Sequence, residues 1–175
     1  MQALKAIPAA DAPDIYALSF FIYDEDDEPQ QPTLTVGYNT ESQVKHVLDN
    51  AKDRGGRRYP DPAEARWNYA YWLQNELAVI GDSNRDPEGA ALRARWIQAT
   101  PRFHGHPELF TARFIAACVR VTHSLHEVGL IERAVGHPVP VLIHELEYYE
   151  QIAKQTEAAN PSGLADRFAA WVRHH

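Results

Sequence analysis

The order of apolar and polar residues predicts two strands near the start of the chain. Residues 15–23, IYALSFFIY, are rich in β-branched and aromatic side chains and apolar on both faces, which is typical of a central strand. The acidic tract DEDDEPQQP follows, and TLTVGY at 33–38 predicts a second strand that returns antiparallel. Residues 1–13 carry two prolines and are expected to form a loose N-terminus.

Helix start signals follow at several places. Thr40 with Gln43 three residues later has the form of a capping box, and we expect this helix to end at the glycines at 55 and 56. Asp61 and Asp86 each precede a proline, which is the pattern of an N-cap followed by the first helical residue. The aromatic segment 67–80 fits either a helix or a strand.

The second half of the chain predicts a long helix, a strand and two more helices. The helical periodicity is strongest at 107–128, where Phe110, Phe114, Cys118 and Leu125 share one apolar stripe. PVPVLIH at 138–144 predicts a third strand, HELEYYEQIAKQTEAAN begins a further helix, and a short amphipathic helix closes the chain. This order predicts an α+β fold: a small, mostly antiparallel sheet, made of a hairpin plus a late strand, covered by several helices in a single domain over 1–175.

Charge and composition narrow the classes of partner. The formal net charge is -7 and the pI is about 5.7. This disfavours nucleic acid and anionic lipid as partners, because phosphate binding needs a basic surface, and it favours a basic protein. One cysteine excludes an internal disulfide, the first residues lack the apolar core of a signal peptide, and the longest apolar run is too short to span a bilayer. We expect a cytoplasmic protein.

The stretch HELEYYEQ at 144–151 has half of a metalloprotease motif. A zinc helix of that type needs a second histidine four residues after the first, and Tyr148 stands there. A weaker alternative keeps His144 and Glu145 as an acid–base pair, or places a metal between them and His104 and His106. The structural interpretation puts Glu145 in the first turn of a helix, where the helix dipole favours acids. We expect neither a metal nor another cofactor.

Two segments are candidates for a binding surface. Four aromatic residues lie within six positions: Trp67, Tyr69, Tyr71 and Trp72. Either another helix covers them or they form a contact surface, since Trp and Tyr dominate interface hot spots. The tract DEDDE contains Asp24, Asp26 and Asp27, and it is either a solvated hairpin tip or a contact for a basic protein surface.

The chain as a whole resembles the bacterial family catalogued as domain of unknown function 4303. The resemblance rests on the early strand IYALSFFIYD, on VGYNTESQ, on RWNYAYW, on the helix FIAACVRVTHSLHEVGL and on the late strand and helix ending at AANP. It implies a bacterial cytoplasmic domain of mixed helix and sheet, and it implies no catalytic residue.

The preferred hypothesis is a non-catalytic binding protein that masks a basic partner, by analogy with toxin-neutralising immunity proteins. The acidic hairpin tip and the aromatic segment would make the contact. The alternative is an enzyme of unassigned reaction with a site at His144 and Glu145, with or without a metal.

Overall fold

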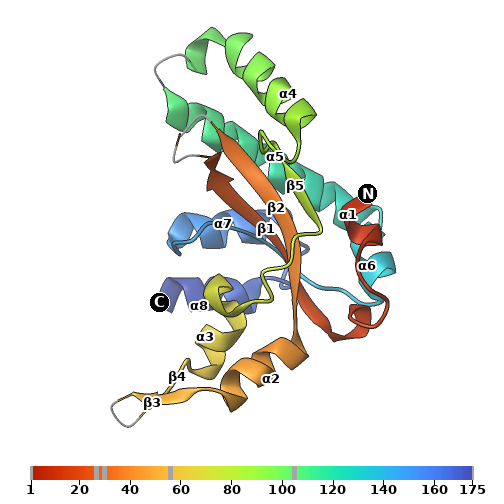
Figure 1. The fold of residues 1–175 in the computed structure, drawn as a ribbon, viewed down its shortest axis with the longest axis vertical. Helices are drawn as coiled ribbons and strands as arrows, with labels where there is room; N and C mark the ends of the chain where they lie inside the picture. The colour runs from red at the N-terminus through yellow and green to blue at the C-terminus, as the bar shows by residue number, and fades with distance from the viewer. Residues whose placement is uncertain (1, 26–27, 29–30, 55–56, 104–105, 175) are drawn as a thin grey trace.

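The fold is built on a four-stranded mixed sheet in the order β5–β2–β1–β6 (Figure 1). The computed structural model describes residues 2–25, 28, 31–54, 57–103 and 106–174. The strands are β1 (Ile15–Asp24), β2 (Pro32–Thr40), β5 (Ala78–Ile80) and β6 (Val141–His144). β1 pairs antiparallel with β2 on one side and parallel with β6 on the other, so the predicted central strand and the predicted α+β class are both confirmed.

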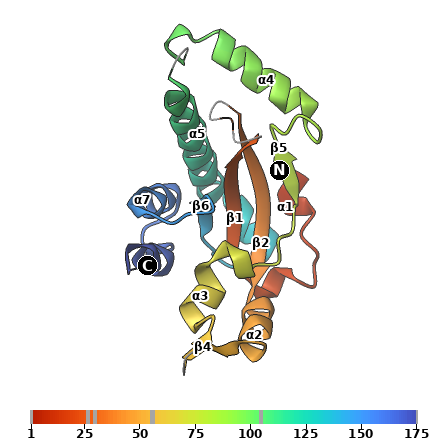
Figure 2. The same cartoon turned by 60° about the vertical axis from the view of Figure 1, so that its left-hand side comes forward.

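Helices pack around this sheet, and a small hairpin lies at one end of the molecule (Figures 1 and 2). The helices in the described part of the chain are α1 (Gln2–Lys5), α2 (Glu41–Asp49), α3 (Pro62–Trp67), α4 (Pro87–Gln98), α5 (Pro107–Glu127), α6 (Leu130–Val135), α7 (Glu150–Ala159) and α8 (Asp166–His174). The hairpin consists of β3 (Lys52–Arg54) and β4 (Arg57–Tyr59).

The predicted helix starts are confirmed by their hydrogen bonds. Asp61 accepts hydrogen bonds from two first-turn N–H groups of α3, and Asp86 accepts one from Gly89 in α4. Thr40 accepts a bond of 3.1 Å from the Gln43 N–H, but the Gln43 side chain donates to the Tyr71 carbonyl instead of returning to Thr40. Only half of the predicted capping box therefore forms, because a tertiary contact competes for the glutamine.

Three predictions about element ends are wrong. α2 ends at Asp49, where the side chain of the following Asn50 donates to the His46 carbonyl, and the chain then forms the β3–β4 hairpin. α7 begins at Glu150, so Glu145 is not in a helical first turn. The N-terminus is not loose, since α1 forms there and Leu4 and Ile7 pack on the core.

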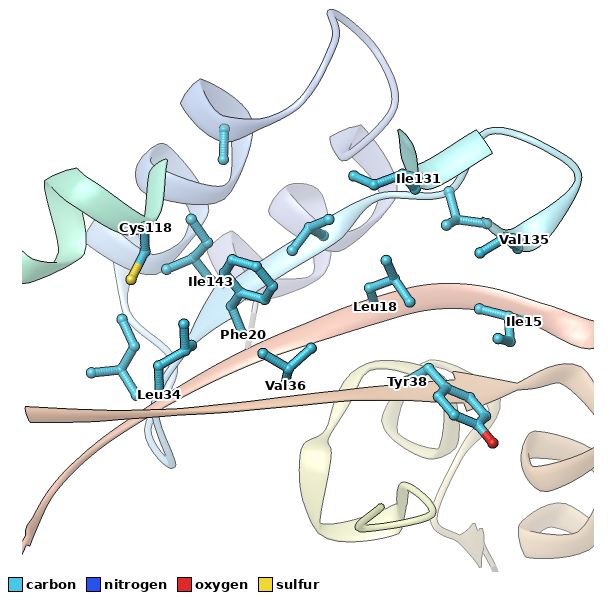
Figure 3. Close-up of a cluster of buried hydrophobic side chains, with 14 residues drawn as sticks. Ile15, Leu18, Phe20, Leu34, Val36, Tyr38, Cys118, Ile131, Val135 and Ile143 are labelled. Atoms are coloured by element: carbon cyan, nitrogen blue, oxygen red, sulfur yellow. The ribbon is translucent and has the colours of Figure 1, made fainter. Parts of the chain in front are cut away.

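The alternation of β1 divides the core between the two faces of the sheet. Leu18, Phe20 and Ile22 point toward α5 and α6, where Cys118 and Ile131 complete a cluster (Figure 3). On the opposite face Ala17 belongs to a second cluster, which is formed with side chains of α3, α7 and α8. Because helices cover both faces of β1, most of its side chains are apolar on both faces, as its sequence predicts.

Side-chain amides satisfy the backbone where two strands have no neighbouring strand. On β6, Asn160 accepts from the Val141 N–H and donates to the Val141 carbonyl, both at 2.8 Å. The Thr156 hydroxyl of α7 accepts from the Ile143 N–H, and the Gln155 side-chain amide donates to the Ile143 carbonyl. On β2, Asn75 accepts from the Tyr38 N–H and donates to its carbonyl. The outer side of β6 is thus tied to α7 by hydrogen bonds that a strand would otherwise make.

Replacement of Asn160 by Ala will destabilise the protein, because it leaves the buried N–H and C=O of Val141 without partners. At roughly 1–3 kcal/mol for each of the two unsatisfied groups, we expect a loss of about 2–6 kcal/mol in the free energy of unfolding, measured by chemical denaturation. Asn50→Ala is the matched control, since Asn50 also ends a helix but is exposed, and its cost should stay below about 1 kcal/mol. Equal losses in the two variants would contradict this role for Asn160.

Candidate functional site

A pocket of about 270 Å³ lies where the parallel strands β1 and β6 end. The end of β1 provides Ile22, Tyr23 and Asp24, the segment after β6 provides Glu145, Leu146, Glu147 and Tyr149, and α5 provides Thr111. Beyond the carboxyl ends of parallel strands the two chains turn away from each other, and the crevice they leave is a common place for ligands. We call these eight residues the acidic pocket.

Asp24 enters the acidic pocket with an unsatisfied oxygen. Burial raises the pKa of its carboxyl, and the guanidinium of Arg93 opposes that change. Oδ1 of Asp24 is shielded from solvent and has no hydrogen-bond partner among the residues that the structure describes. A desolvated carboxylate oxygen without a donor is costly, so Asp24 favours the arrival of a donor or a cation.

Glu145 supplies the second carboxylate of the acidic pocket. Burial raises its pKa, the hydrogen bond from the Tyr149 hydroxyl to Oε2 at 3.1 Å lowers it, and the negative charges of Asp24 and Glu147 raise it further. Because the negative charge of Asp24 raises the pKa of Glu145, the two carboxylates interact electrostatically. Paired carboxylates that are each partly desolvated hold an excess of negative potential in the pocket.

Arg93 does not cancel this excess, because its guanidinium is engaged by other groups. The side chain is 8% exposed and donates to Glu25 at 2.9 Å, to Gln31 at 3.1 Å and to the Pro32 carbonyl at 3.3 Å. Glu25 also accepts from the N–H and the hydroxyl of Ser83. The ion pair therefore joins α4 to the turn after β1, and the Arg93 charge lowers the pKa of Asp24 by less than burial raises it.

Exposed apolar and aromatic groups complete the acidic pocket. Tyr23 is 42% exposed, Tyr149 45% and Leu146 66%, although each is large and partly apolar. Burial and the Glu145 carboxylate raise the pKa of Tyr149 to about 12, so its hydroxyl stays neutral and remains a donor. The pocket thus combines negative charge with aromatic surface, which is the combination that binds organic cations.

The buried His144 is not among the residues that line the acidic pocket, and it packs against the rings of Phe21, Tyr69 and Tyr148. Its Nδ1 is 3.1 Å from the Glu145 carbonyl, which can only accept, so Nδ1 carries the proton and Nε2 accepts from the Ser19 hydroxyl at 2.8 Å. Burial lowers its pKa to about 4. The predicted acid–base pair of His144 with Glu145 is wrong, since the contact is to the backbone of Glu145 and both ring nitrogens are occupied.

The predicted histidine metal site does not form in the described part of the chain. His106 is exposed and lies 3.2 Å from Glu108, while His104 falls outside the described residues. Among residues 2–25, 28, 31–54, 57–103 and 106–174, no group of three His, Cys, Asp or Glu side chains is placed to hold a metal ion.

The aromatic segment packs inward, which corrects its assignment as a contact surface. Trp67 and Trp72 are 8% and 4% exposed, and both contact Tyr16 edge-on. The half-buried Tyr69 stacks on Phe21 at 4.8 Å between ring centroids and also contacts His144. Tyr71, also half-buried, contacts Tyr59 edge-on. Helices α3, α7 and α8 cover the tryptophans, so the core-packing alternative holds for them.

Of the three aspartates of the acidic tract, one lies in the acidic pocket and two lie outside the described residues. Asp24 ends β1 inside the acidic pocket and is not at a hairpin tip, whereas Asp26 and Asp27 lie outside the described residues. The sequence marked Asp24 and Glu145 as separate candidates but did not predict that they lie in one pocket. The missing signal was the direction of the late strand, because parallel pairing of β6 with β1 sets the two carboxylates at one edge.

Comparison of the chain with family models, with curated proteins and with solved structures finds no match. The resemblance to the domain of unknown function 4303 family therefore stays a prediction. Within the residues that the structure describes, none of the helices combines the length and the apolar character that crossing a bilayer requires.

The buried histidine makes the fold sensitive to acid. Between pH 6.5 and pH about 4 the unfolded chain binds a proton at His144 that the folded chain does not, so the free energy of unfolding falls as the pH is lowered through this window. The full loss is roughly 3 kcal/mol, and His126, whose pKa burial also lowers, adds to it in the same direction.

We expect His144→Gln to flatten this pH dependence in denaturation curves taken across the window. His123→Gln, on an exposed side chain near Glu127, is the matched control and should keep the wild-type slope. The same slope in His144→Gln as in the wild type would show that His144 is not the proton-linked group.

Proposed function

We propose that this chain is a non-catalytic binding protein whose acidic pocket takes an arginine side chain of a basic protein partner. The observation that carries the proposal is the pair Asp24 and Glu145. They are two partly buried carboxylates with raised pKa in one open pocket, and an oxygen of Asp24 accepts no hydrogen bond from the residues that the structure describes. The proposal extends by analogy to proteins that neutralise a basic partner, in the bacterial cytoplasm that the family resemblance implies.

Arginine suits the acidic pocket better than lysine does. Its guanidinium presents five donors in a planar fork, so one group can donate to Asp24 Oδ1 and to the Glu145 carboxylate together. The same plane can stack on an exposed tyrosine, and the pocket offers Tyr23 and Tyr149. A lysine ammonium would supply charge but no flat face.

Binding of a cation would also relieve a cost that the free protein carries. A raised pKa means that the ionised carboxylate is disfavoured by the fold, and a guanidinium restores its stabilisation. Affinity should therefore fall as the pH is lowered through the range in which Asp24 and Glu145 take up protons. The net charge of -7 would steer a basic partner over longer distance, and salt would weaken this steering.

The direct test is an NMR titration with the peptide acetyl-Gly-Arg-Gly-amide. We expect shift changes concentrated at residues 22–24 and 145–149, and none there with the same peptide carrying neutral citrulline in place of arginine. In the double variant Asp24→Asn with Glu145→Gln, the affinity should fall by about tenfold or more, because two charge-assisted hydrogen bonds are lost.

The control variant is Glu88→Gln with Glu132→Gln, which removes the same charge from two exposed positions outside the pocket. It should bind as the wild type does. If both double variants lose affinity equally, or if shift changes spread over the whole acidic surface, the attraction is general and the pocket is not a specific site.

A further inference from the structure

A second cavity, of about 580 Å³, lies between the N-terminal segment and α6. Its walls are mostly apolar, and the two elements lie side by side in Figure 1. The lining residues with apolar side chains are Leu4, Ile7, Ala9, Ala12, Leu130, Ala134 and Val135. Small-molecule sites have this character: a concave, largely apolar surface of a few hundred Å³ with a small number of polar groups.

The ionisable side chains of this cavity have the opposite sign from the rest of the protein. Lys5 and Arg133 are the ionisable residues among those that line it, and both are cations on a chain whose net charge is -7. In the part of the chain that the structure describes, neither forms an ion pair. Two unpaired cations beside an apolar wall select for a ligand with an anionic head and an apolar body.

The carboxylates of the N-terminal segment hydrogen-bond to β2 and α2, and among the described residues neither forms an ion pair with Lys5 or Arg133. Asp11 accepts a hydrogen bond from the Tyr38 hydroxyl, and Asp14 accepts one from the Ser42 N–H at 3.0 Å. The hydrogen bond from Ser42 lowers the pKa of Asp14. The positive charge of Lys5 and Arg133 therefore stays available to a ligand.

We propose that this cavity binds a free single-chain carboxylate, with the alkyl chain against Leu4, Ile7 and Leu130 and the carboxylate between Lys5 and Arg133. The site does not depend on the acidic pocket, which has the opposite charge and is built from β1, α5 and the segment after β6. An occupant would hold the N-terminal segment against α6 and so stabilise the fold by mass action.

The test compares three probes of equal chain length by isothermal titration calorimetry: dodecanoate and dodecyltrimethylammonium, each below its critical micelle concentration, and dodecanol below its solubility limit. Dodecanoate is expected to bind, dodecanol to bind about tenfold more weakly, and dodecyltrimethylammonium not to bind. In the double variant Lys5→Gln with Arg133→Gln, the affinity for dodecanoate should fall to that for dodecanol. The affinity for dodecanol itself should not change.

Two controls separate this site from general attraction. Lys45→Gln with Arg167→Gln makes the same charge change at exposed positions outside the cavity and should leave dodecanoate binding unchanged. Ala134→Phe fills the cavity and should abolish binding of both dodecanoate and dodecanol, whereas Ala112→Phe on the exposed side of α5 should not. Absence of dodecanoate binding to the wild type, equal affinity for dodecanoate and dodecanol, or unchanged binding in the Lys5 and Arg133 variant would overturn the proposal.

Discussion

The parallel docking of β6 on β1 is the constraint on which the rest of the structure depends. β6 is only four residues long, and none of the strands in the described ranges pairs with its outer side, so side chains of α7 and the adjacent Asn160 satisfy its backbone. This arrangement fixes α7, and with it α8, against the second face of the sheet. It also fixes where the chain leaves the sheet after His144, and therefore where Glu145 stands relative to Asp24.

The position of the acidic pocket follows from that docking. The neighbouring His144, hydrogen-bonded on both ring nitrogens, is buried in a neutral form and adds no charge there. Arg93 ties α4 to the turn after β1 through Glu25, Gln31 and Pro32, and none of the described residues donates a hydrogen bond to Asp24 Oδ1. Two partly buried carboxylates that share one pocket and both have a raised pKa are an arrangement found often at functional sites, because structural carboxylates are normally paired.

Local sequence rules predicted the elements, and tertiary contacts decided where they meet. A run of β-branched and aromatic residues that is apolar on both faces gave the central strand β1, and aspartate–proline pairs gave the starts of α3 and α4. The predicted start of α7 was wrong because Tyr148 packs on Trp171 and accepts a hydrogen bond from the Tyr69 N–H. These tertiary contacts hold the segment before Glu150 outside the helix. The candidate site was predicted only in pieces: Asp24 and Glu145 carried signals, but local patterns contain no information on whether β6 runs parallel or antiparallel to β1.

The most direct test of this account is the titration of the Glu145 side-chain carboxyl, followed by ¹³C NMR in the wild type and in Asp24→Asn. Burial and the neighbouring Asp24 charge should raise the pKa of Glu145 above the ordinary range of a glutamate, and Asp24→Asn should lower it toward that range. An ordinary pKa for Glu145 that does not respond to Asp24→Asn would mean that the two carboxylates do not share a pocket, and it would contradict the placement of β6 beside β1.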